Sequence, residues 1–220
     1  MAAIYDCSVP TELLTGMRLA RAALSRGELV VVPTDTVYGL AAAAFSPRAV
    51  QRLLDAKGRT RQSPPPVLIP STQTLDALAT DIPTSARTLV DAFWPGGLTL
   101  ILQATPSLMW DLGETHGTVA LRMPSDPITL ELLAETGPLA VSSANLTGQP
   151  AASSAADAET MLGDSVQVYL DGGVRTDAVA STIVDATLPN GRVAIVRHGA
   201  VSEESIRALL GDLLQPGTGS

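Results

Sequence analysis

Short apolar runs alternate with amphipathic segments along most of this chain. Apolar residues recur at helical spacing and predict helices at residues 10–26, 47–57, 74–80, 83–93, 127–136, 155–162 and 202–213. Strand-length apolar runs lie between them, at residues 30–32, 67–69, 98–103, 118–122, 138–142, 166–170, 181–185 and 192–197. Strands that alternate with helices are typical of an α/β fold, and the last two runs are close enough to form a hairpin, so we expect a mixed sheet.

The 220 residues hold neither an internal repeat nor a linker long enough to divide them. Hydrophobic residues make up 45% of the chain, which is enough for one buried core of Ala, Val and Leu. We therefore expect a single domain over residues 1–220, with its core at residues 10–213 and a frayed tail at 214–220.

The net charge and the cysteine content limit which ligands and which compartment are expected for this protein. A formal net charge of −8 argues against a protein that coats itself broadly on nucleic acid or anionic membrane, so any anion site must be local. Cys7 is the one cysteine, which excludes an internal disulfide and a cysteine-based metal cluster and fits a reducing compartment. The sequence shows neither an N-terminal signal pattern nor a run of 18 apolar residues, so we expect a cytoplasmic protein without membrane contact.

Polar side chains follow four of the predicted strands at the points where the strands end. The four runs lead, in chain order, into Thr34 with Asp35, Thr36 and Tyr38; into Arg122; into Ser142 with Ser143 and Asn145; and into Arg197. A polar residue after a single apolar run usually marks no more than a loop. Ligands of open α/β folds bind outside strand ends, however, and four such ends rich in Arg, Ser and Thr predict a site for a polyanion.

Lys57, at the end of the predicted helix 47–57, is the one lysine beside thirteen arginines. In a chain that uses Arg for nearly every positive charge, a retained Lys indicates a place that needs a compact ammonium rather than a planar guanidinium. The alternative is a lysine kept by chance at a helix C-terminus, where it also suits the helix dipole. The residue count leaves both interpretations open.

Several chemistries lack the residues that they need. With two histidines, His116 and His198, and no Gly-x-Ser-x-Gly segment, a serine triad is not indicated, and zinc chemistry lacks its ligand spacing. Neither G-x-x-x-x-G-K-[ST] nor G-x-G-x-x-G is present. Positioning and charge neutralisation remain, and they suffice for nucleotidyl transfer between two negatively charged reactants.

Seven ordered motifs resemble those of one family. The first is PTDTVYGL at residues 33–40, followed by AKGR at 56–59. The others are FWPGGLTL at 93–100, VALRMP at 119–124, SSANLTG at 142–148, DGG at 171–173, STIVD at 181–185 and VRHG at 196–199. Over residues 10–210 the chain resembles the YrdC-type threonylcarbamoyl-AMP synthases, in a short single-domain form. The resemblance implies a YrdC-like fold: a twisted mixed β-sheet flanked by helices, with a concave ligand cleft.

The resemblance also implies a reaction. In that family, threonine and bicarbonate combine as a carbamate, which takes AMP from ATP and releases pyrophosphate. The product, threonylcarbamoyl-AMP, supplies the threonylcarbamoyl group for a tRNA adenosine. The expected partners are thus ATP, L-threonine, bicarbonate, Mg²⁺ bound with ATP, and downstream threonylcarbamoyl-transferase proteins. The family's reaction implies no organic cofactor and no covalent enzyme intermediate.

Carried over position by position, the resemblance assigns two groups of binding residues. Those expected around threonine are Thr36, Arg122, Ser143 and Ser181, with Thr34 and Tyr38 as second choices. Those expected around ATP are Arg59, Ser63, Thr118, Asn145, Ser153 and Arg197. Lys57 and Arg59 are expected to act electrostatically by holding phosphate oxygens. Asp35 is either a water-mediated contact to Mg²⁺ or, more simply, a turn-stabilising carboxylate.

The chain departs from the family pattern at several positions, which leaves the detail of its loops open. In and beyond the loop after Lys57, a usual Pro, Asn and His are replaced by Thr60, Ser63 and Leu68. Further along, a usual His, Glu and Pro are replaced by Asp126, Ala180 and His198.

Two rival functions remain from the sequence. The same fold could serve as a nucleotide-binding or double-stranded RNA-binding paralogue without turnover, although the acidic composition disfavours binding to RNA or tRNA. The second rival is a carbamoyl-transfer or hydrolase activity on related acyl-adenylates. Incubation with ATP, threonine and bicarbonate, followed by an assay for pyrophosphate and the adenylate, discriminates between these functions.

Overall fold

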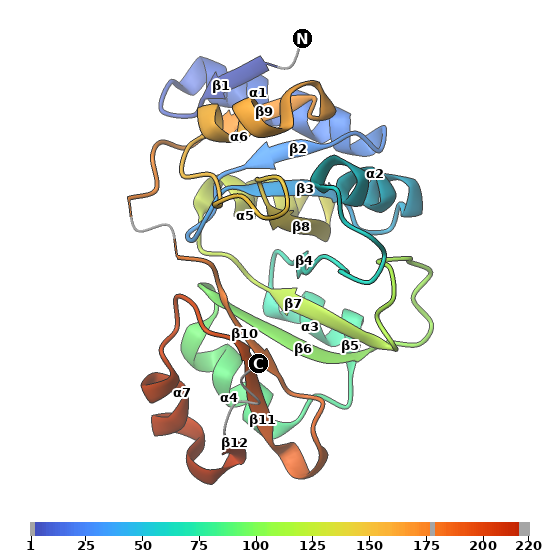
Figure 1. The fold of residues 1–220 in the computed structure, drawn as a ribbon, viewed down its shortest axis with the longest axis vertical. Coiled ribbons are helices and arrows are strands. Elements are labelled where there is room, and N and C mark those ends of the chain that lie inside the picture. Colours follow the sequence, from blue (N-terminus) through green and yellow to red (C-terminus); the bar gives the residue numbers. More distant parts are fainter. Residues whose placement is uncertain (1–2, 177–178, 216–220) are drawn as a thin grey trace.

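The computed structural model describes residues 3–176 and 179–215 as a mixed α/β structure (Figure 1). Its helices are α1 (Pro10–Ser25), α2 (Pro47–Lys57), α3 (Thr72–Leu78), α4 (Thr84–Phe93), α5 (Pro127–Thr136), α6 (Ala155–Leu162) and α7 (Glu203–Leu210), with short 3-10 turns η1 (Gly163–Ser165), η2 (Pro189–Gly191) and η3 (Gly211–Leu213). Its strands are β1 (Ala3–Asp6), β2 (Val30–Val32), β3 (Gly39–Ala43), β4 (Val67–Leu68), β5 (Ala79–Thr80), β6 (Leu98–Ala104), β7 (Thr118–Arg122), β8 (Leu139–Ser143), β9 (Val168–Asp171), β10 (Thr182–Asp185), β11 (Val193–Arg197) and β12 (Leu214–Gln215).

All of these strands belong to one open, twisted sheet. Their order across the sheet is β1-β9-β2-β3-β8-β4-β7-β6-β10-β11-β12, and β5 pairs with β6 at the side of this path. The sheet contains parallel pairs, such as β4 with β7 and β6 with β10, and antiparallel pairs, such as β3 with β8 and β6 with β7. The expected hairpin of β10 and β11 is antiparallel, so the prediction of a mixed α/β sheet is confirmed.

Helix α2 shows how local sequence signals set the ends of an element. The Ser46 side chain accepts a hydrogen bond from the backbone N–H of Ala49 (3.3 Å), and Pro47 occupies the first turn, where its missing N–H costs nothing. Gly58 ends the helix in the left-handed conformation (φ 64°), which glycine adopts without a Cβ clash. Leu53 and Leu54 are fully buried, so the helix packs on the sheet along one side.

Helices cover both faces of the upper half of the sheet, as oriented in Figure 1. Val30 and Val32 of β2 face a core cluster that includes residues of α1 and α5, whereas Val31 faces a second cluster with residues of α2 and α6. This follows from the period of two along a strand, which sends successive side chains to opposite faces. The upper strands are therefore buried on both sides.

In the part of the chain that the structure describes, the lower half of the sheet has helices on one face only. Its core side packs against α3, α4 and α7 through alternate strand residues, namely Leu98, Leu100, Leu102, Val119, Leu121 and Val184. The residues between them point to the other face, and these are Thr99, Ile101, Thr118, Ala120, Arg122 and Ile183. The face without a helix layer is where the candidate site lies.

Four strands fall outside the predicted pattern. The predicted helix 74–80 ends at Leu78, and Ala79 and Thr80 instead form β5, which pairs with β6. β1 precedes the predicted core at residue 10, and β3 was not distinguished from the polar segment that follows β2. At the other end, Leu214 and Gln215 pair with Val193 and Ala194, so these two residues belong to the sheet rather than to a frayed tail. Residues 216–220 of the expected tail lie outside the described residues. Among the described residues, no helix combines the length and apolar character that a membrane crossing requires.

Candidate functional site

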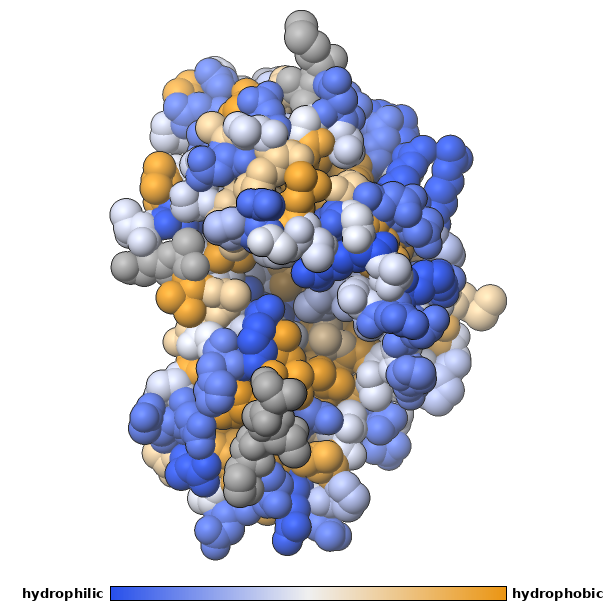
Figure 2. Space-filling model, viewed as in Figure 1, coloured by the Kyte–Doolittle hydropathy of each residue, from blue (hydrophilic) through white to orange (hydrophobic). Residues whose placement is uncertain are grey.

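A cavity of about 530 Å³ opens on the uncovered face, where the two halves of the sheet meet. Figure 2 shows the surface hollowed at this level. Its floor is made by the outward-facing residues of β6, β7 and β10, and its walls include parts of β8, the segment 59–66, the segment 112–118 and the end of β11. The strand ends chosen from the sequence therefore contribute only part of the cavity lining. Alternate positions along β6, β7 and β10 and the two segments contribute the other lining residues.

Arg122 is the most tightly held charged group in the cavity. Its Nε donates to the carbonyl oxygen of Gly96 (2.9 Å), Nη1 to Oγ1 of Thr36 (2.9 Å) and Nη2 to Oδ1 of Asp35 (2.8 Å). Burial lowers the pKa of this guanidinium, and the neighbouring Asp35 carboxylate opposes that effect. Two of its five N–H groups remain for a ligand, so Arg122 can present a fork to a carboxylate.

Asp35 holds Arg122 and a neighbouring loop with one oxygen. Its Oδ1 accepts hydrogen bonds from Nη2 of Arg122 and from the backbone N–H of Ser125 (3.0 Å). The Asp35 side chain is 17% exposed and that of Arg122 is 7% exposed, which makes this a largely buried ion pair. Of the two interpretations of Asp35, the geometry favours a structural carboxylate, although one that orients an arginine rather than a turn alone.

Arg59 and Arg197 add two further guanidinium groups to the cavity wall. Nη1 of Arg59 donates to Oγ of Ser142 (3.1 Å), and Arg197 donates to the carbonyl oxygen of Ser181 (2.7 Å from Nη2). Burial lowers the pKa of Arg197, and the like charges of Arg122 and Arg59 lower it further. Within residues 3–176 and 179–215, neither Arg59 nor Arg197 forms a salt bridge. Three guanidinium groups line the cavity, against the Asp35 carboxylate paired with Arg122 and the Glu114 carboxylate in the wall, and this positive balance favours a bound anion.

Hydroxyl groups lie next to two arginines of the site, Arg122 and Arg197. Oγ1 of Thr36 lies 3.1 Å from Oγ1 of Thr34, which donates to the carbonyl oxygen of Val37. Oγ of Ser181 lies 2.9 Å from Oγ1 of Thr99 and accepts from Nη2 of Arg197 (3.0 Å). Thr34, Thr36, Ser143 and Ser181 thus all line the cavity that Arg122 faces, together with Thr118 from the group expected around ATP.

Lys57 and Asn145 lie beneath the cavity rather than in its wall. Nζ of Lys57 donates to the carbonyl oxygen of Ser143 and to that of Asn145 (2.6 Å), and lies 3.4 Å from Oδ1 of Asn145. Lys57 is 1% exposed, and burial, with a smaller effect from Arg59, lowers the pKa of its ammonium to about 8. Nδ2 of Asn145 donates to the carbonyl oxygens of Leu146 and Gln149. The direct contacts expected from Lys57 to phosphate and from Asn145 to ATP are therefore replaced here by contacts within the protein.

Of three other expected residues, Tyr38 lines the cavity but directs its hydroxyl away from it, and Ser63 and Ser153 lie outside the cavity lining. The hydroxyl of Tyr38 lies 2.7 Å from the carbonyl oxygen of Gly173 and 3.0 Å from Oδ1 of Asp171, and burial raises its pKa. Ser63 is exposed and does not line the cavity. Ser153 donates to Oδ2 of Asp157 (2.8 Å), also outside the cavity lining.

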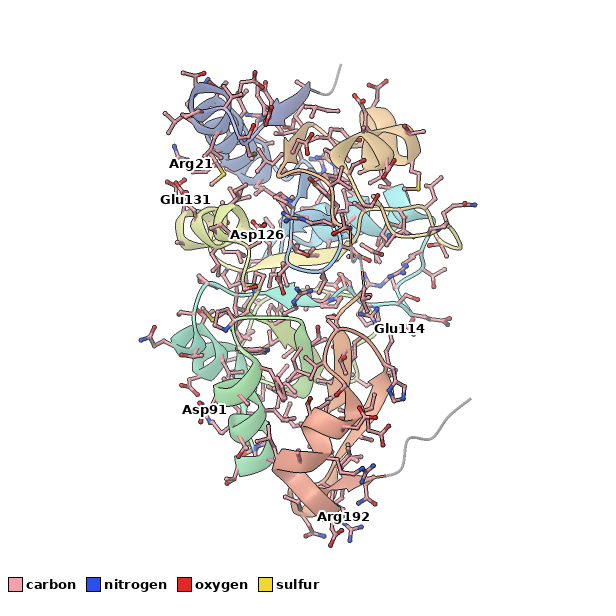
Figure 3. The ribbon with its side chains drawn as sticks, turned by 90° about the vertical axis from the view of Figure 1, so that its left-hand side faces the viewer. Arg21, Asp91, Glu114, Asp126, Glu131 and Arg192 are labelled. Carbon is pink, nitrogen blue, oxygen red and sulfur yellow. The ribbon has the colours of Figure 1, made fainter. Side chains whose placement is uncertain are left out.

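Sequence reasoning missed one wall of the cavity. Glu114, Thr115 and His116 line it from the segment between β6 and β7, and Figure 3 shows Glu114 at the level where the two halves of the sheet meet. This segment carries no recognisable motif. Ile101 and Ile183 were also missed, although the period of two along β6 and β10 could have identified them as facing away from the core.

Two of the departures from the family pattern have clear places in the structure. Asp126, labelled in Figure 3, accepts hydrogen bonds from the N–H groups of Ile128 and Thr129 at the start of α5 and forms an ion pair with Arg175 (2.7 Å). Leu68 lies opposite Arg122 in the β4–β7 register and lines the cavity. Asp126 is thus a helix cap, and Leu68 makes the wall beside Arg122 apolar.

Comparisons with known proteins agree with this geometry. The family model Sua5_yciO_yrdC, described as telomere recombination, matches residues 22–199. A Mycobacterium tuberculosis (H37Rv) protein, provisionally named as a threonylcarbamoyl-AMP synthase, is 49% identical over 211 residues, which are 96% of this chain and 96% of that protein. The threonylcarbamoyl-AMP synthase of Bacillus subtilis is 38% identical over 197 residues, which are 88% of this chain and 56% of the relative.

A solved structure supports the same relationship. The crystal structure of Pyrococcus abyssi Sua5 complexed with L-threonine superposes with a TM-score of 0.87 and 33% identity, and the match covers 98% of this chain and 63% of that chain. The fold, the ordered motifs and these similarities agree over nearly the full length of the chain. The chain belongs to the Sua5/YciO/YrdC family.

Proposed function

We propose that this protein is a threonylcarbamoyl-AMP synthase, which forms threonylcarbamoyl-AMP and pyrophosphate from L-threonine, bicarbonate and ATP. The observation that carries the proposal is that Arg59, Arg122 and Arg197 line one cavity together with several Ser and Thr hydroxyl groups, in a chain whose relatives bear this name. The enzyme needs no covalent nucleophile, because positioning and charge neutralisation suffice for this transfer.

Threonine is proposed to bind at the Arg122 end of the cavity. The two free N–H groups of the fixed guanidinium suit its carboxylate, and the hydroxyls of Thr36, Ser143 and Ser181 suit its polar groups. The Pyrococcus protein was crystallised in complex with L-threonine, which supports this substrate. Because Asp35 already neutralises much of the charge of Arg122, this guanidinium recognises a bound carboxylate by the direction of its hydrogen bonds as well as by its charge.

ATP is proposed to bind where Arg59, Thr118 and Arg197 line the cavity. The carbamate oxygen that attacks and the α-phosphorus group that is attacked both carry negative charge, so two guanidinium groups without carboxylate partners lower the repulsion between them. The carbamate O–P bond forms as the bond to pyrophosphate breaks, and pyrophosphate leaves with the electron pair.

Mg²⁺ is proposed to enter with ATP. Within the described residues no group of three His, Cys, Asp or Glu side chains is arranged to hold a metal ion, so the nucleotide phosphates are its expected ligands. Both hydrogen bonds to Asp35 use Oδ1, which leaves Oδ2 for a water-mediated contact to the ion. When bound, the ion would neutralise the charge of the leaving pyrophosphate.

The deciding experiment measures pyrophosphate release by the purified protein. Release is expected to require ATP, threonine and bicarbonate together, with threonylcarbamoyl-AMP identified by mass spectrometry. Pyrophosphate release from ATP alone, or none in any mixture with folded protein, would remove the proposal in favour of a hydrolase or a binding paralogue. As a synthase, the protein acts in the cytoplasm and upstream of a protein that transfers the threonylcarbamoyl group to tRNA.

A further inference from the structure

Two segments from opposite halves of the sheet meet at one side of the cavity. Residues 58–66 follow α2 in the upper half, and residues 105–117 connect β6 to β7 in the lower half, at the right of Figure 1. Both segments line the cavity, the first through Arg59 and Gln62 and the second through Glu114 and His116. The distance between the segments therefore sets the width of the cavity at this side.

Arg61 joins these two segments through both its side chain and its backbone. Its Nη2 forms an ion pair with Oδ1 of Asp111 (2.6 Å), and the same Oδ1 accepts a hydrogen bond from the N–H of Gly113 (3.1 Å). Its carbonyl oxygen accepts a hydrogen bond from the N–H of Glu114 (2.8 Å). The ion pair is exposed and would be weak alone, whereas the backbone bond fixes the chain two residues from Arg59.

Gly113 is required for this close approach. Its φ of 108° lies in the region that favours glycine, and a Cβ at this position would come within 2.6 Å of the carbonyl oxygen of Arg61. A side chain of any size would therefore push the two segments apart. The backbones are in direct contact here because no side chain separates them.

A second attachment lies at the other end of α2. The rings of Phe45 and Trp110 stack with centroids 5.4 Å apart and an interplanar angle of 22°. Phe45 precedes α2 and Arg61 follows it, so the segment 105–117 is fastened at both ends of this helix. We call the six residues that make these contacts the clasp: Phe45, Arg61, Trp110, Asp111, Gly113 and Glu114.

We propose that the clasp is a positioning device for ATP, with Arg61 and Gly113 as positioning residues that hold Arg59 at the cavity wall. The inference rests on the proposed function, because it assigns Arg59 to the nucleotide. Arg122, the proposed contact to threonine, is held separately by Gly96, Thr36 and Asp35. Loosening the clasp should therefore weaken the binding of ATP and leave that of threonine nearly unchanged.

The test compares Arg61→Ala, Asp111→Ala and Gly113→Ala with the unaltered protein in steady-state kinetics. Gly113→Ala, which separates the two backbones, is expected to raise the KM for ATP about 10-fold, less than the roughly 100-fold cost of a 1 Å misplacement. Arg61→Ala and Asp111→Ala remove the exposed ion pair but keep the backbone bond, and they are expected to raise this KM about 3- to 5-fold. All three changes should alter the KM for threonine less than about 2-fold. Asp111→Ala discriminates most sharply. It makes the cavity rim more positive, so a purely electrostatic role predicts tighter ATP binding, whereas the clasp predicts weaker binding.

Matched control variants show how much of each effect comes from losing any exposed ion pair, or from adding a Cβ to any glycine of positive φ. Arg21→Ala and Glu135→Ala break an ion pair of similar length (2.7 Å) and exposure between α1 and α5. Gly137→Ala places a Cβ on another glycine of positive φ (78°) that has nothing within 4 Å of the added atom. All three controls are expected to keep both KM values.

A charge swap completes the test if Gly113→Ala fails to fold. The double variant Arg61→Asp, Asp111→Arg restores the ion pair with its charges exchanged. Its KM for ATP should be lower than that of Arg61→Asp alone or of Asp111→Arg alone, and close to that of the unaltered protein. Equal rises in both KM values, unchanged KM for ATP in Arg61→Ala, or tighter ATP binding in Asp111→Ala would overturn the clasp while leaving the synthase proposal intact. The synthase proposal fails separately, if the unaltered protein makes no adenylate.

Discussion

Lys57 and Asn145 form a buried pair beneath the cavity, with Nζ of Lys57 2.6 Å from the carbonyl oxygen of Asn145 and 3.4 Å from its side-chain oxygen. The pair joins the end of α2 to the segment that follows β8. Lys57 also donates to the carbonyl oxygen of Ser143 in β8, and Nη1 of Arg59 donates to Oγ of Ser142 in that strand. The lysine thus stabilises the end of β8 that Arg59 contacts. The single lysine of the chain therefore acts on the site through the backbone of β8.

Removal of the Lys57 ammonium should destabilise the protein as well as slow it. Lys57→Met leaves the buried carbonyl oxygens of Ser143 and Asn145 without their donor, and an unsatisfied buried group costs about 1–3 kcal/mol. Urea unfolding at pH 7 measures this loss. Lys57→Arg should also be impaired, because a planar guanidinium does not fit three acceptors around one nitrogen. Unchanged stability and activity in Lys57→Arg would contradict this role.

The buried ammonium also predicts a dependence of stability on pH. Burial lowers the pKa of Lys57 to about 8 in the folded protein, against 10.5 for an ordinary lysine. Between these values the unfolded chain binds a proton that the folded protein has released, so the stability contributed by this site rises with pH. The free energy of unfolding of the unaltered protein should rise relative to that of Lys57→Met from pH 8 to pH 10. Parallel pH profiles of the two proteins would show that the Lys57 pKa is not depressed.

Arg59 should matter for turnover and little for stability. Its one side-chain hydrogen bond within the described residues goes to Ser142, so Arg59→Ala should change the free energy of unfolding by less than about 0.5 kcal/mol. Loss of one preorganised cation should lower kcat/KM by about 100- to 1000-fold. The exposed Arg48, which lies on α2, provides the control Arg48→Ala with the same change of charge. Comparable losses in both variants would point to long-range charge instead of a contact.

Substitution of Ser181 can show whether its hydroxyl binds threonine or instead stabilises the fold. If its hydroxyl contacts the amino acid, Ser181→Ala should raise the KM for threonine about 10- to 150-fold and that for ATP far less. The hydroxyl also contacts Thr99 and Arg197, so a purely structural role would lower the melting temperature and affect both substrates alike. Separate titrations of threonine and ATP, beside a melting curve, distinguish these outcomes.

Asp35 should be important for stability because it pairs with a buried charge. Asp35→Ala leaves the Arg122 guanidinium without its carboxylate, and the loss of one partner from such a pair costs about 3–5 kcal/mol. Asp35→Asn keeps an oxygen for Arg122 and Ser125 and should cost less. Urea unfolding of both variants tests this order. Native stability in Asp35→Ala, combined with an altered Mg²⁺ requirement, would instead favour the water-mediated metal contact.

The elements with strong local signals could be predicted from the sequence, because short-range chemistry fixes them. Ser46, Pro47 and Gly58 set the ends of α2, and the predicted α5 and α6 have the observed bounds. β3 and β12 were missed for a different reason. Gly39–Ala43 is an Ala-rich run whose burial depends on strands distant in sequence, and Leu214–Gln215 is held by pairing with β11. Such pairings have no local signature.

Polar residues of the candidate site could be chosen from motifs, but their distances from a ligand could not. Arg59 and Ser143 line the cavity as expected, whereas Lys57 and Asn145, which belong to the same two motifs, lie beneath it. Residue type does not distinguish a side chain that faces the cavity from one that faces the backbone behind it. Glu114 and His116 could not be found at all, since the clasp that brings their segment to the cavity depends on contacts between the two halves of the sheet.

The alternation along β6, β7 and β10 has a consequence for how this protein can change. Along each of these strands, residues that pack in the core alternate with residues that line the cavity. Substitution at Ile101, Ala120 or Ile183 can therefore reshape the cavity without touching the core. Insertion or deletion of a single residue in β7 has the opposite effect, because it exchanges Leu121 with Arg122 and places a guanidinium among aliphatic side chains. Selection, natural or in the laboratory, can therefore explore new ligands through point substitutions in these strands, while their length stays constant.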